Sequence, residues 1–473
     1  MTASDRGANV SIGTDESRGG NLLAAALVCL VTVVAFETMS VATIMPKVLD
    51  DLGGIGLYGW AFSGLALGEV LGIVVAGMWS DRANPSRPIL AGLAVYSGGL
   101  VVSGSASSMF MVVVGRVLQG YGSGTVPAVA YVCVGRGFAE AERPRVFAWM
   151  STAWVVPAMI GPSAAGWASQ HVGWRIVFLG LIPVVVGVGA LAIRPIGRLG
   201  LPIGVDVAGR DAARSRLRWA LVAVVGAGIA LAGLQTERLP VLIVEFFVGA
   251  VVLLWAFRRL TPPGTLRVAP GVPSTVAVRG MLTFSFLGAD AYVSLAMQDV
   301  RGMSESEAGI VLSAAAITWT AGSWYSARTI TRVGPRRLVT IGLAVVVVGI
   351  GLMVWVVDSA VSPWWAAGSW LVAGLGIGMA YAPLTQAVLS SADPAQLGAA
   401  TSGLQLSDVL GFALGTGLGG ALVALADREN ISVSGSTVHA GVLAVFALTG
   451  VVGVMGVLVS RRMLRFLGAD SSR

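Results

Sequence analysis

The sequence predicts an all-α polytopic membrane protein of two six-helix bundles with two extra central helices, about 14 transmembrane helices in all. The 473-residue chain is 55% hydrophobic and only 12% charged, and its mean hydropathy is +0.82. A soluble protein is nearer a quarter charged, so most of this chain must lie in a lipid solvent. A second observation, an internal repeat, indicates how the helices are grouped.

The chain repeats itself at about half its length. Residues 77–95 read GMWSDRANPSRPILAGLAV, and residues 327–345 read ARTITRVGPRRLVTIGLAV. The two copies align without a gap at an offset of 250 positions, and both are short basic turns between long apolar runs. This pattern indicates two homologous helical bundles. The matching pairs are Arg82 with Arg332, Pro85 with Pro335, Arg87 with Arg337, and Gly92 with Gly342.

Apolar runs of about 20 residues can cross a membrane, and here they fall into groups of six, two and six. The first group lies near 22–46, 57–79, 88–107, 109–135, 146–170 and 174–194. The others lie near 219–236 and 239–257, and then near 280–299, 307–328, 337–357, 363–389, 397–426 and 438–460. The first run is too long for a signal-peptide core, so we expect it to stay as a spanning helix.

These groups predict seven segments along the chain. They are a disordered cytoplasmic tail (1–20), an N-terminal six-helix bundle (21–194), a basic cytoplasmic segment (195–218), two extra transmembrane helices (219–258), a Pro-rich cytoplasmic linker (259–278), a C-terminal six-helix bundle (279–460) and a cytoplasmic tail (461–473).

The basic residues between the spans predict the orientation. With the N-terminus inside, 25 basic residues fall on the cytoplasmic side and Arg116 stays within a span. This asymmetry predicts that both termini are cytoplasmic, in a multi-pass protein of the cell inner (plasma) membrane. The number of spans must then be even: fourteen, or twelve if the middle pair lies elsewhere. The basic residues left outside are Lys47, Arg175, Arg238, Arg301 and Arg428.

Composition also argues against several function classes. The net charge of +7 comes from short Arg runs, without the continuous basic face of a nucleic-acid binder. Cys29 and Cys133 lie in apolar runs, and the only histidines are His171 and His439, so we expect no metal site and no enzyme activity. Glycine-rich runs inside spans lack the Lys-Ser/Thr of a P-loop, so we expect neither ATP nor any other cofactor.

The loop after the second span carries a family motif. It reads Gly77-Met-Trp-Ser-Asp81-Arg82, with Arg87 following. It is similar to the first half of the G-x-x-x-D-R-x-G-R-[RK] signature of the major facilitator superfamily, although Asn84 replaces the second glycine. An Asp beside an Arg at a helix end can form a charge latch to a neighbouring helix and so favour one bundle arrangement. The alternative is an ordinary turn that only sets topology.

The fourth span contains Arg116-Val-Leu-Gln119-Gly120, which resembles the R-x-x-Q-G-x-G motif of the same superfamily. A guanidinium inside a span costs several kcal/mol unless it is paired or hydrated, so it is usually interior and functional. The resemblance implies that Arg116 takes part in proton coupling; a purely structural ion pair is the alternative.

The first span carries Glu37 nine residues before Pro46, a spacing shown by the superfamily's fourteen-helix drug:proton antiporters. The resemblance to this group covers nearly the whole chain. Burial disfavours the charged form of a carboxylate. Such a group can carry a proton or pair with a cationic substrate but not both at once, which is antiport in its simplest form.

The fifth span looks like the antiporter motif G-x-x-x-G-P-x-x-G-G. It keeps Gly161, Pro162 and Gly166, with Pro157 and Ala165 at two of the glycine positions. Small residues allow close helix approach, and a proline bends the helix, which suits a bundle that must rock. The resemblance implies export.

Three more acidic residues lie in or near spans: Glu69, Asp290 and Asp408. An unpaired acid within a span is functional by default, and the alternatives are a helix–helix hydrogen bond or a place near the membrane surface. Asp290 lies in the first span of the second half, the counterpart of the span that carries Glu37. We therefore expect these acids to share the proton-coupling or substrate role.

The resemblance implies a proton-coupled antiporter that exports amphipathic small molecules or drugs by alternating access. Its expected partners are the substrate, protons and membrane lipids, and it is expected to be a monomer. Fourteen-helix relatives also include exporters of lipids or lipid conjugates, which is the first alternative. An alternative of another class is a non-transporting membrane sensor or scaffold with the same fold. A scaffold would gain nothing from keeping costly buried charges.

Overall fold

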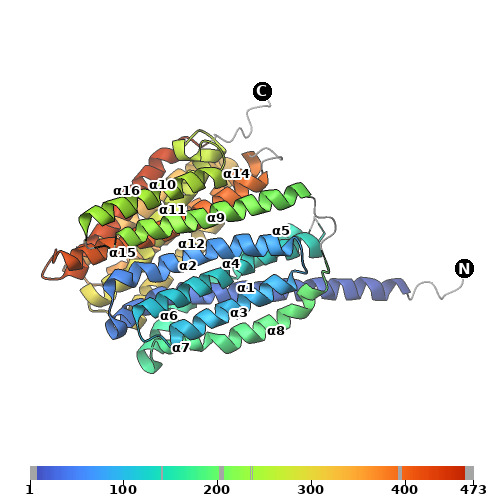
Figure 1. Ribbon diagram of the computed structural model, residues 1–473, viewed down its shortest axis with the longest axis horizontal. Coiled ribbons are helices and arrows are strands. Elements are labelled where there is room, and N and C mark those ends of the chain that lie inside the picture. Colours follow the sequence, from blue (N-terminus) through green and yellow to red (C-terminus); the bar gives the residue numbers. More distant parts are fainter. Residues whose placement is uncertain are drawn as a thin grey trace, which may run out of the picture.

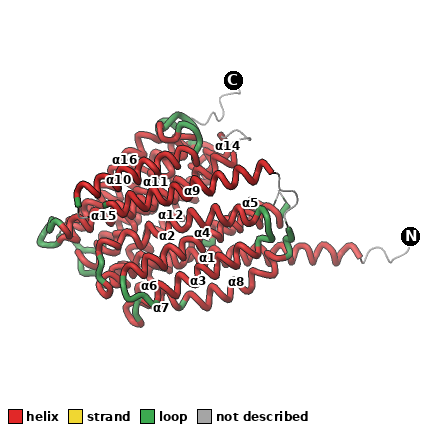
Figure 2. Tube along the Cα trace, viewed as in Figure 1, coloured by secondary structure: helices red, strands yellow, loops and turns green. Residues whose placement is uncertain are grey.

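The computed structural model describes residues 8–139, 142–201, 207–234, 236, 238–358, 360–391 and 397–463. Over these residues the protein is helical without strands, and the helices lie side by side with short connections (Figures 1 and 2). Ten of the described helices are long and apolar enough to cross a membrane. The predicted all-α fold class is confirmed, and the sixteen described α-helices correspond to fourteen predicted spans because two spans are each broken in two.

The first half begins with α1, from which the N-terminal part projects beyond the bundle (Figure 1). Its helices are α1 (Ala8–Leu52), α2 (Tyr58–Ser80), α3 (Ser86–Gly104), α4 (Met109–Gly137), α5 (Arg143–Thr152), α6 (Val155–Val172), α7 (Arg175–Leu179) and α8 (Leu181–Gly197). The middle pair is α9 (Val207–Gly233) and α10 (Leu239–Leu260). The second half contains α11 (Val272–Leu295), α12 (Glu305–Val333), α13 (Pro335–Asp358), α14 (Trp365–Ser391), α15 (Leu397–Arg428) and α16 (Thr437–Ser460).

Two spans that the sequence predicts as single helices are each broken in two. The span 146–170 is α5 followed by α6, and the span 174–194 is α7 followed by α8. A proline, Pro157 or Pro183, follows each break. Proline lacks a backbone N–H, and its ring clashes with the carbonyl four residues earlier, so it disfavours a continuous helix across these points.

Two helices begin earlier than the sequence predicts. Helix α1 starts at Ala8, inside the predicted disordered tail, of which residues 1–7 lie outside the described part of the chain. Helix α11 starts at Val272 with Pro273 in its first turn, a favoured place for proline. Arg279, which the topology count places among the cytoplasmic residues, is therefore buried inside a helix.

The internal repeat corresponds to equivalent helix crossings in the two halves. A Cβ atom on Gly92 of α3 would lie 2.6 Å from the Thr125 side chain of α4. A Cβ atom on Gly342 of α13 would lie 2.5 Å from the Gly376 carbonyl oxygen of α14. The matched glycines thus permit the same close approach between matched helices, as duplication predicts.

The two halves meet along two seams, α2 with α15 and α6 with α12, and also through α1 and α11. The polar contacts between α1 or α2 and α11 lie where α1 ends and α2 begins. The Tyr58 hydroxyl donates to the Ala291 carbonyl at 3.1 Å, and the Ser294 hydroxyl donates to the Thr43 carbonyl at 3.0 Å. Gln298 Nε2 also donates to Thr43, at 2.9 Å. This end of the interface between the halves is closed.

The extra helices lie against the α2–α15 seam: α9 contacts both helices and α10 packs against α9 (Figure 1). At one point three helices meet. A Cβ atom on Gly417 of α15 would lie 2.6 Å from the Leu231 methyl groups of α9 and 2.8 Å from the Ser63 hydroxyl of α2. The extra pair is therefore packed against both halves.

Candidate functional site

A buried ion pair joins α1 and α4 in the first half. Arg116 Nη1 donates to Glu37 Oε1, and the two side chains are 1% and 0% exposed. The same nitrogen donates to Gln119 Oε1 at 2.9 Å, and Arg116 Nε donates to the Ala61 carbonyl of α2 at 3.0 Å. The structure thus brings together three residues that the sequence motifs predict, Glu37 from α1 and Arg116 and Gln119 from α4.

The pair leaves several polar atoms unsatisfied. Glu37 Oε2, Gln119 Nε2 and the Tyr96 hydroxyl are buried without a hydrogen-bond partner. Tyr96, on α3, interacts electrostatically with the Glu37 carboxylate. An unsatisfied buried polar atom costs about 1–3 kcal/mol, so this site favours any ligand or proton that occupies the free oxygen. No sequence motif indicated Tyr96.

Gly120 of the same motif has a packing role. A Cβ atom on Gly120 would lie 1.9 Å from the Leu65 carbonyl oxygen, and one on Gly124 would lie 2.3 Å from the Glu69 carbonyl oxygen. Only glycine therefore allows α4 to lie this close to α2. The close approach brings Arg116 within reach of the Ala61 carbonyl.

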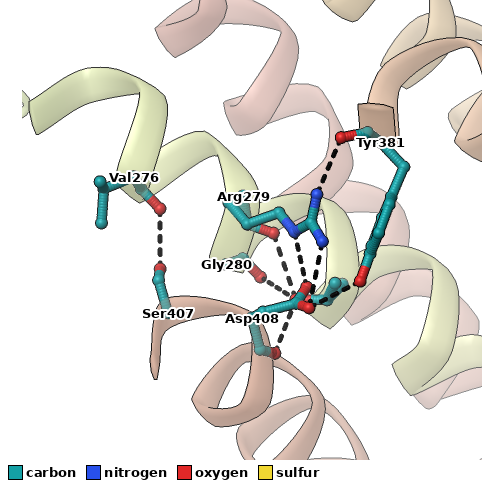
Figure 3. Close-up of polar contacts among 7 residues, drawn as sticks. Val276, Arg279, Gly280, Tyr381, Ser407 and Asp408 are labelled. Carbon is teal, nitrogen blue, oxygen red and sulfur yellow. Dashed lines mark hydrogen bonds and ion pairs between the residues drawn. The ribbon is translucent and has the colours of Figure 1, made fainter. Parts of the chain in front are cut away.

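A second charged cluster joins α11, α14 and α15 in the other half (Figure 3). Arg279 donates to both carboxylate oxygens of Asp408, at 2.8 Å and 3.2 Å, and to the Tyr381 carbonyl at 2.8 Å. The Tyr381 hydroxyl donates to Asp408 at 2.8 Å. Sequence reasoning predicted Asp408 but missed Arg279, because Arg279 was assigned to a cytoplasmic flank. A signal was available, because an acid inside a span is commonly paired with a basic residue on a neighbouring helix.

The other two predicted acids have weaker partners. Asp290 accepts a hydrogen bond from the Trp370 indole at 2.7 Å and has no basic partner among the described residues. Glu69 makes neither a hydrogen bond nor an ion pair within the described part of the chain, but it interacts electrostatically with Asp408. The five predicted charged residues therefore do not form one site: Glu37 pairs with Arg116, Asp408 pairs with Arg279 and interacts with Glu69, and Asp290 stands apart with Trp370.

The predicted latch residues lie at the end of α2 and in the following turn. Asp81, Arg82 and Arg87 are exposed, and their side chains make no hydrogen bond or ion pair with the described residues. The Asp81 backbone N–H donates to the Gly77 carbonyl. A carboxylate at a helix C-terminus is disfavoured by the helix dipole, so Asp81 needs a basic partner from elsewhere to act as a latch.

Two other residues hold this loop. Asn84 Nδ2 donates to the Gly197 carbonyl at the end of α8, at 2.7 Å. Arg136 of α4 donates to the Ser80 carbonyl at 2.8 Å. Asn84 is the residue that departs from the family signature, and here its hydrogen bond joins the loop to the end of α8. The latch itself stays a prediction.

The antiporter-like motif lies on the α6–α12 seam between the halves. A Cβ atom on Gly166 would lie 2.4 Å from the Glu305 carbonyl oxygen, and one on Gly309 of α12 would lie 2.5 Å from the Pro162 carbonyl oxygen. Gly161 faces α1 instead, where its Cβ would lie 3.2 Å from the Ser40 hydroxyl. The motif therefore brings α6 against the opposite half as well as against α1.

The described helices, ten of which are long and apolar enough to cross a membrane, and the buried ion pairs are typical of a multi-pass membrane protein. The chain belongs to the Major Facilitator Superfamily, whose model matches residues 27–416 and 279–468. Membership of this superfamily and the names of its relatives indicate a transporter, and the bacterial relatives indicate the plasma membrane.

Three relatives illustrate the similarity. An uncharacterized MFS-type transporter of Mycobacterium tuberculosis is 28% identical, and the match spans 85% of this chain but only 59% of that protein. A probable multidrug-efflux transporter of the same organism is 26% identical, over 88% of this chain and 90% of the relative. A triacylglyceride transporter of Mycolicibacterium hassiacum is 27% identical, over 84% and 78%.

Solved structures share the fold at low sequence identity. An auto-inhibited peptide transporter of the POT family has a TM-score of 0.71 at 17% identity, covering 94% of this chain and 98% of the other. A bacterial homolog of the human lysosomal transporter Spinster has a TM-score of 0.63 at 16% identity, with the same coverage.

Proposed function

We propose that this transporter is a proton-coupled antiporter of the fourteen-helix drug:proton type, which exports amphipathic small molecules by alternating access. The observation that carries the proposal is the buried pair of Arg116 and Glu37, with one carboxylate oxygen left free. The name of the similar multidrug-efflux transporter supports the substrate class.

Proton exchange follows from the chemistry of the pair. An ionised Glu37 is stabilised by Arg116, whereas a protonated Glu37 releases that attraction and leaves the guanidinium to Gln119 and the Ala61 carbonyl. Protonation therefore loosens α1 from α4. A cationic substrate group near the same carboxylate would favour its ionised form, so substrate and proton exclude each other.

The closed end of the interface fits an inward-facing state. The positive-inside rule supports cytoplasmic termini, which would put the contacts of Thr43 and Tyr58 on the outer side. In that orientation substrate enters from the cytoplasm or the inner leaflet. Protonation from outside would require the halves to rock about the α2–α15 and α6–α12 seams.

Export of lipids or lipid conjugates is the second candidate. The similar triacylglyceride transporter of Mycolicibacterium hassiacum supports it. The amphipathic character that both substrate classes share suits a core with only a few charged groups.

An efflux assay tests the proposal and separates the two candidates. The full chain would be expressed in a host that lacks its own efflux pumps and loaded with a panel of dyes, antimicrobials and a fluorescent acylglycerol. We expect efflux of at least one amphipathic compound, and we expect a proton uncoupler to stop it. Efflux that continues unchanged with the uncoupler would contradict proton coupling, and efflux of the acylglycerol alone would favour the lipid candidate.

A further inference from the structure

Helices α2 and α15 run antiparallel, and residues about one turn apart on α2 contact successive residues on α15. Where the seam is tightest, a Cβ atom on Gly59 would lie 2.8 Å from the Gly420 Cα atom. One turn along α2, the Ser63 hydroxyl lies 3.0 Å from the Thr416 hydroxyl. Leu67 then belongs to an apolar cluster that also includes residues of α15.

Glu69 and Asp408 are the next polar pair along this seam. They come from opposite halves of the protein, and their carboxylates interact electrostatically. Glu69 is only partly buried, and the Asp408 side chain is 21% exposed. The backbone of Glu69 is held in place by α4, because its carbonyl lies against Gly124. The Glu69 backbone is therefore fixed by packing against α4, and both acidic side chains remain partly accessible.

The charges at this point do not balance. Asp408 is already neutralised by Arg279 through two hydrogen bonds and accepts a third from Tyr381. Glu69 has no such partner among the described residues. Two carboxylates and one guanidinium leave one negative charge uncompensated inside the bundle, where such a charge is costly. Repulsion between the two carboxylates adds to this cost.

In the part of the chain that the structure describes, no basic side chain forms an ion pair or a hydrogen bond with Glu69. Arg116, on the neighbouring helix α4, is bonded to Glu37, Gln119 and the Ala61 carbonyl. Tyr131 of α4 interacts with Arg279 and Tyr381. An external positive charge is thus the simplest way to compensate Glu69.

We propose that Glu69, opposite Asp408, is a second cation-exchange site of this transporter, distinct from the Glu37–Arg116 pair. It binds one monovalent positive charge, either a proton or the cationic group of a substrate. The inference rests on the proposed function, since a charge exchanged here contributes to antiport only if the protein is an antiporter. The proposal adds Glu69 of the α2–α15 seam to the exchange residues, so a positive charge would bind where the two halves meet.

Infrared difference spectroscopy between neutral and mildly acidic pH tests the proposal. The full-length protein would be reconstituted in phosphatidylethanolamine–phosphatidylglycerol vesicles. We expect the carbonyl band of a protonated carboxyl group to be lost in Glu69→Gln and retained in Glu69→Asp. The matched control is Glu245→Gln, because Glu245 lies in α10, outside both halves, and accepts a hydrogen bond from the Thr236 hydroxyl at 3.0 Å. This control should leave the Glu69 band unchanged.

A second arm identifies the source of the charge. Tetraphenylphosphonium, a monocation without an exchangeable proton, would be added to weakly buffered protein. Release of about one proton per transporter by the wild type and none by Glu69→Gln would show that proton and organic cation compete for Glu69. An unchanged wild-type band would assign the site to protons alone. Identical spectra for wild type and Glu69→Gln, with equal tetraphenylphosphonium binding, would overturn the proposal.

These measurements do not depend on transport. Loss of the Glu69 band with no proton-driven efflux would leave this site standing and contradict the antiporter proposal. Proton-driven efflux with an unaltered Glu69→Gln spectrum would do the opposite.

Discussion

Arg116 binds Glu37 through one carboxylate oxygen and leaves the other, Oε2, buried and free. The guanidinium is held independently, by Gln119 on its own helix and by the Ala61 carbonyl of α2. Arg116 is therefore a fixed positive charge, and Glu37 is the partner that can change its charge state. This asymmetry defines what each substitution should do.

Glu37→Gln should abolish or greatly weaken proton-driven efflux without loss of expression. The amide can still accept the Arg116 hydrogen bond but cannot release a proton. The measurement is efflux from loaded cells over a range of pH, with membrane protein levels compared by immunoblot. Full efflux at every pH would move the proton role to Asp290 or Asp408.

Arg116→Ala should lose efflux and also stability. Removing one partner of a buried ion pair leaves an uncompensated charge and typically costs about 3–5 kcal/mol. The measurement is thermal unfolding of the purified protein in detergent, where Arg116→Ala should unfold at a clearly lower temperature than Glu37→Gln. Arg332→Ala, at an exposed position, is the control. Equal stability of Arg116→Ala and the control would contradict a buried pair.

Gly309→Ala should weaken the α6–α12 seam. The added methyl group would lie 2.5 Å from the Pro162 carbonyl oxygen, so the helices must separate. Cysteines at Ser163 and Ser313, whose hydroxyls lie 2.9 Å apart, report on the seam by disulfide formation. We expect slower crosslinking in Gly309→Ala.

The matched control for this substitution is Gly351→Ala on α13, where an added Cβ atom would meet nothing within 4 Å. It should crosslink at the wild-type rate. Unchanged crosslinking in Gly309→Ala would show that α6 and α12 accommodate the added methyl group without separating.

Asp81→Asn should reduce transport while substrate still binds, if the loop latch works through charge. Thr331 occupies the position equivalent to Asp81 in the second copy and cannot carry charge, so Arg332→Ala should be much milder. Substrate binding and efflux measured side by side decide the matter. Equal damage from both substitutions would show that the two loops act alike.

The topology prediction concerns both ends of the chain. Reporter fusions after Gly20 and after Arg465 should both report the cytoplasm, because the basic residues are concentrated on that side. Opposite locations would contradict a two-bundle arrangement with an even number of spans.

The fold was largely predictable from the sequence because hydrophobic length and the internal repeat depend on the chain alone. Helix breaks were not. The spans around Pro157 and Pro183 are apolar throughout, so their hydropathy does not reveal where proline interrupts the backbone hydrogen bonds of the helix. The repeat did place Gly92 and Gly342 at equivalent positions, and both lie at close helix crossings.

The candidate site was predictable where a local motif carried it. The spacing of Arg116 and Gln119 places both on one helix face, and the spacing of Glu37 and Pro46 indicated the acid on α1. The sequence analysis did not predict that Glu37 and Arg116 pair with each other. Arg279 and Tyr96 were missed, since their roles depend on which helices become neighbours. Arg279 lies near the start of α11, where hydropathy alone does not separate a helix from its basic flank.

The three-helix junction at Gly417 has a mechanical consequence. Leu231 of the extra hairpin covers that glycine, and Ser63 of the first half lies against the same point. If α2 and α15 separated, α9 could follow only one of them and would have to slide over the other. The extra hairpin should therefore resist separation of the two halves at the α2–α15 seam. The α6–α12 seam should separate more easily.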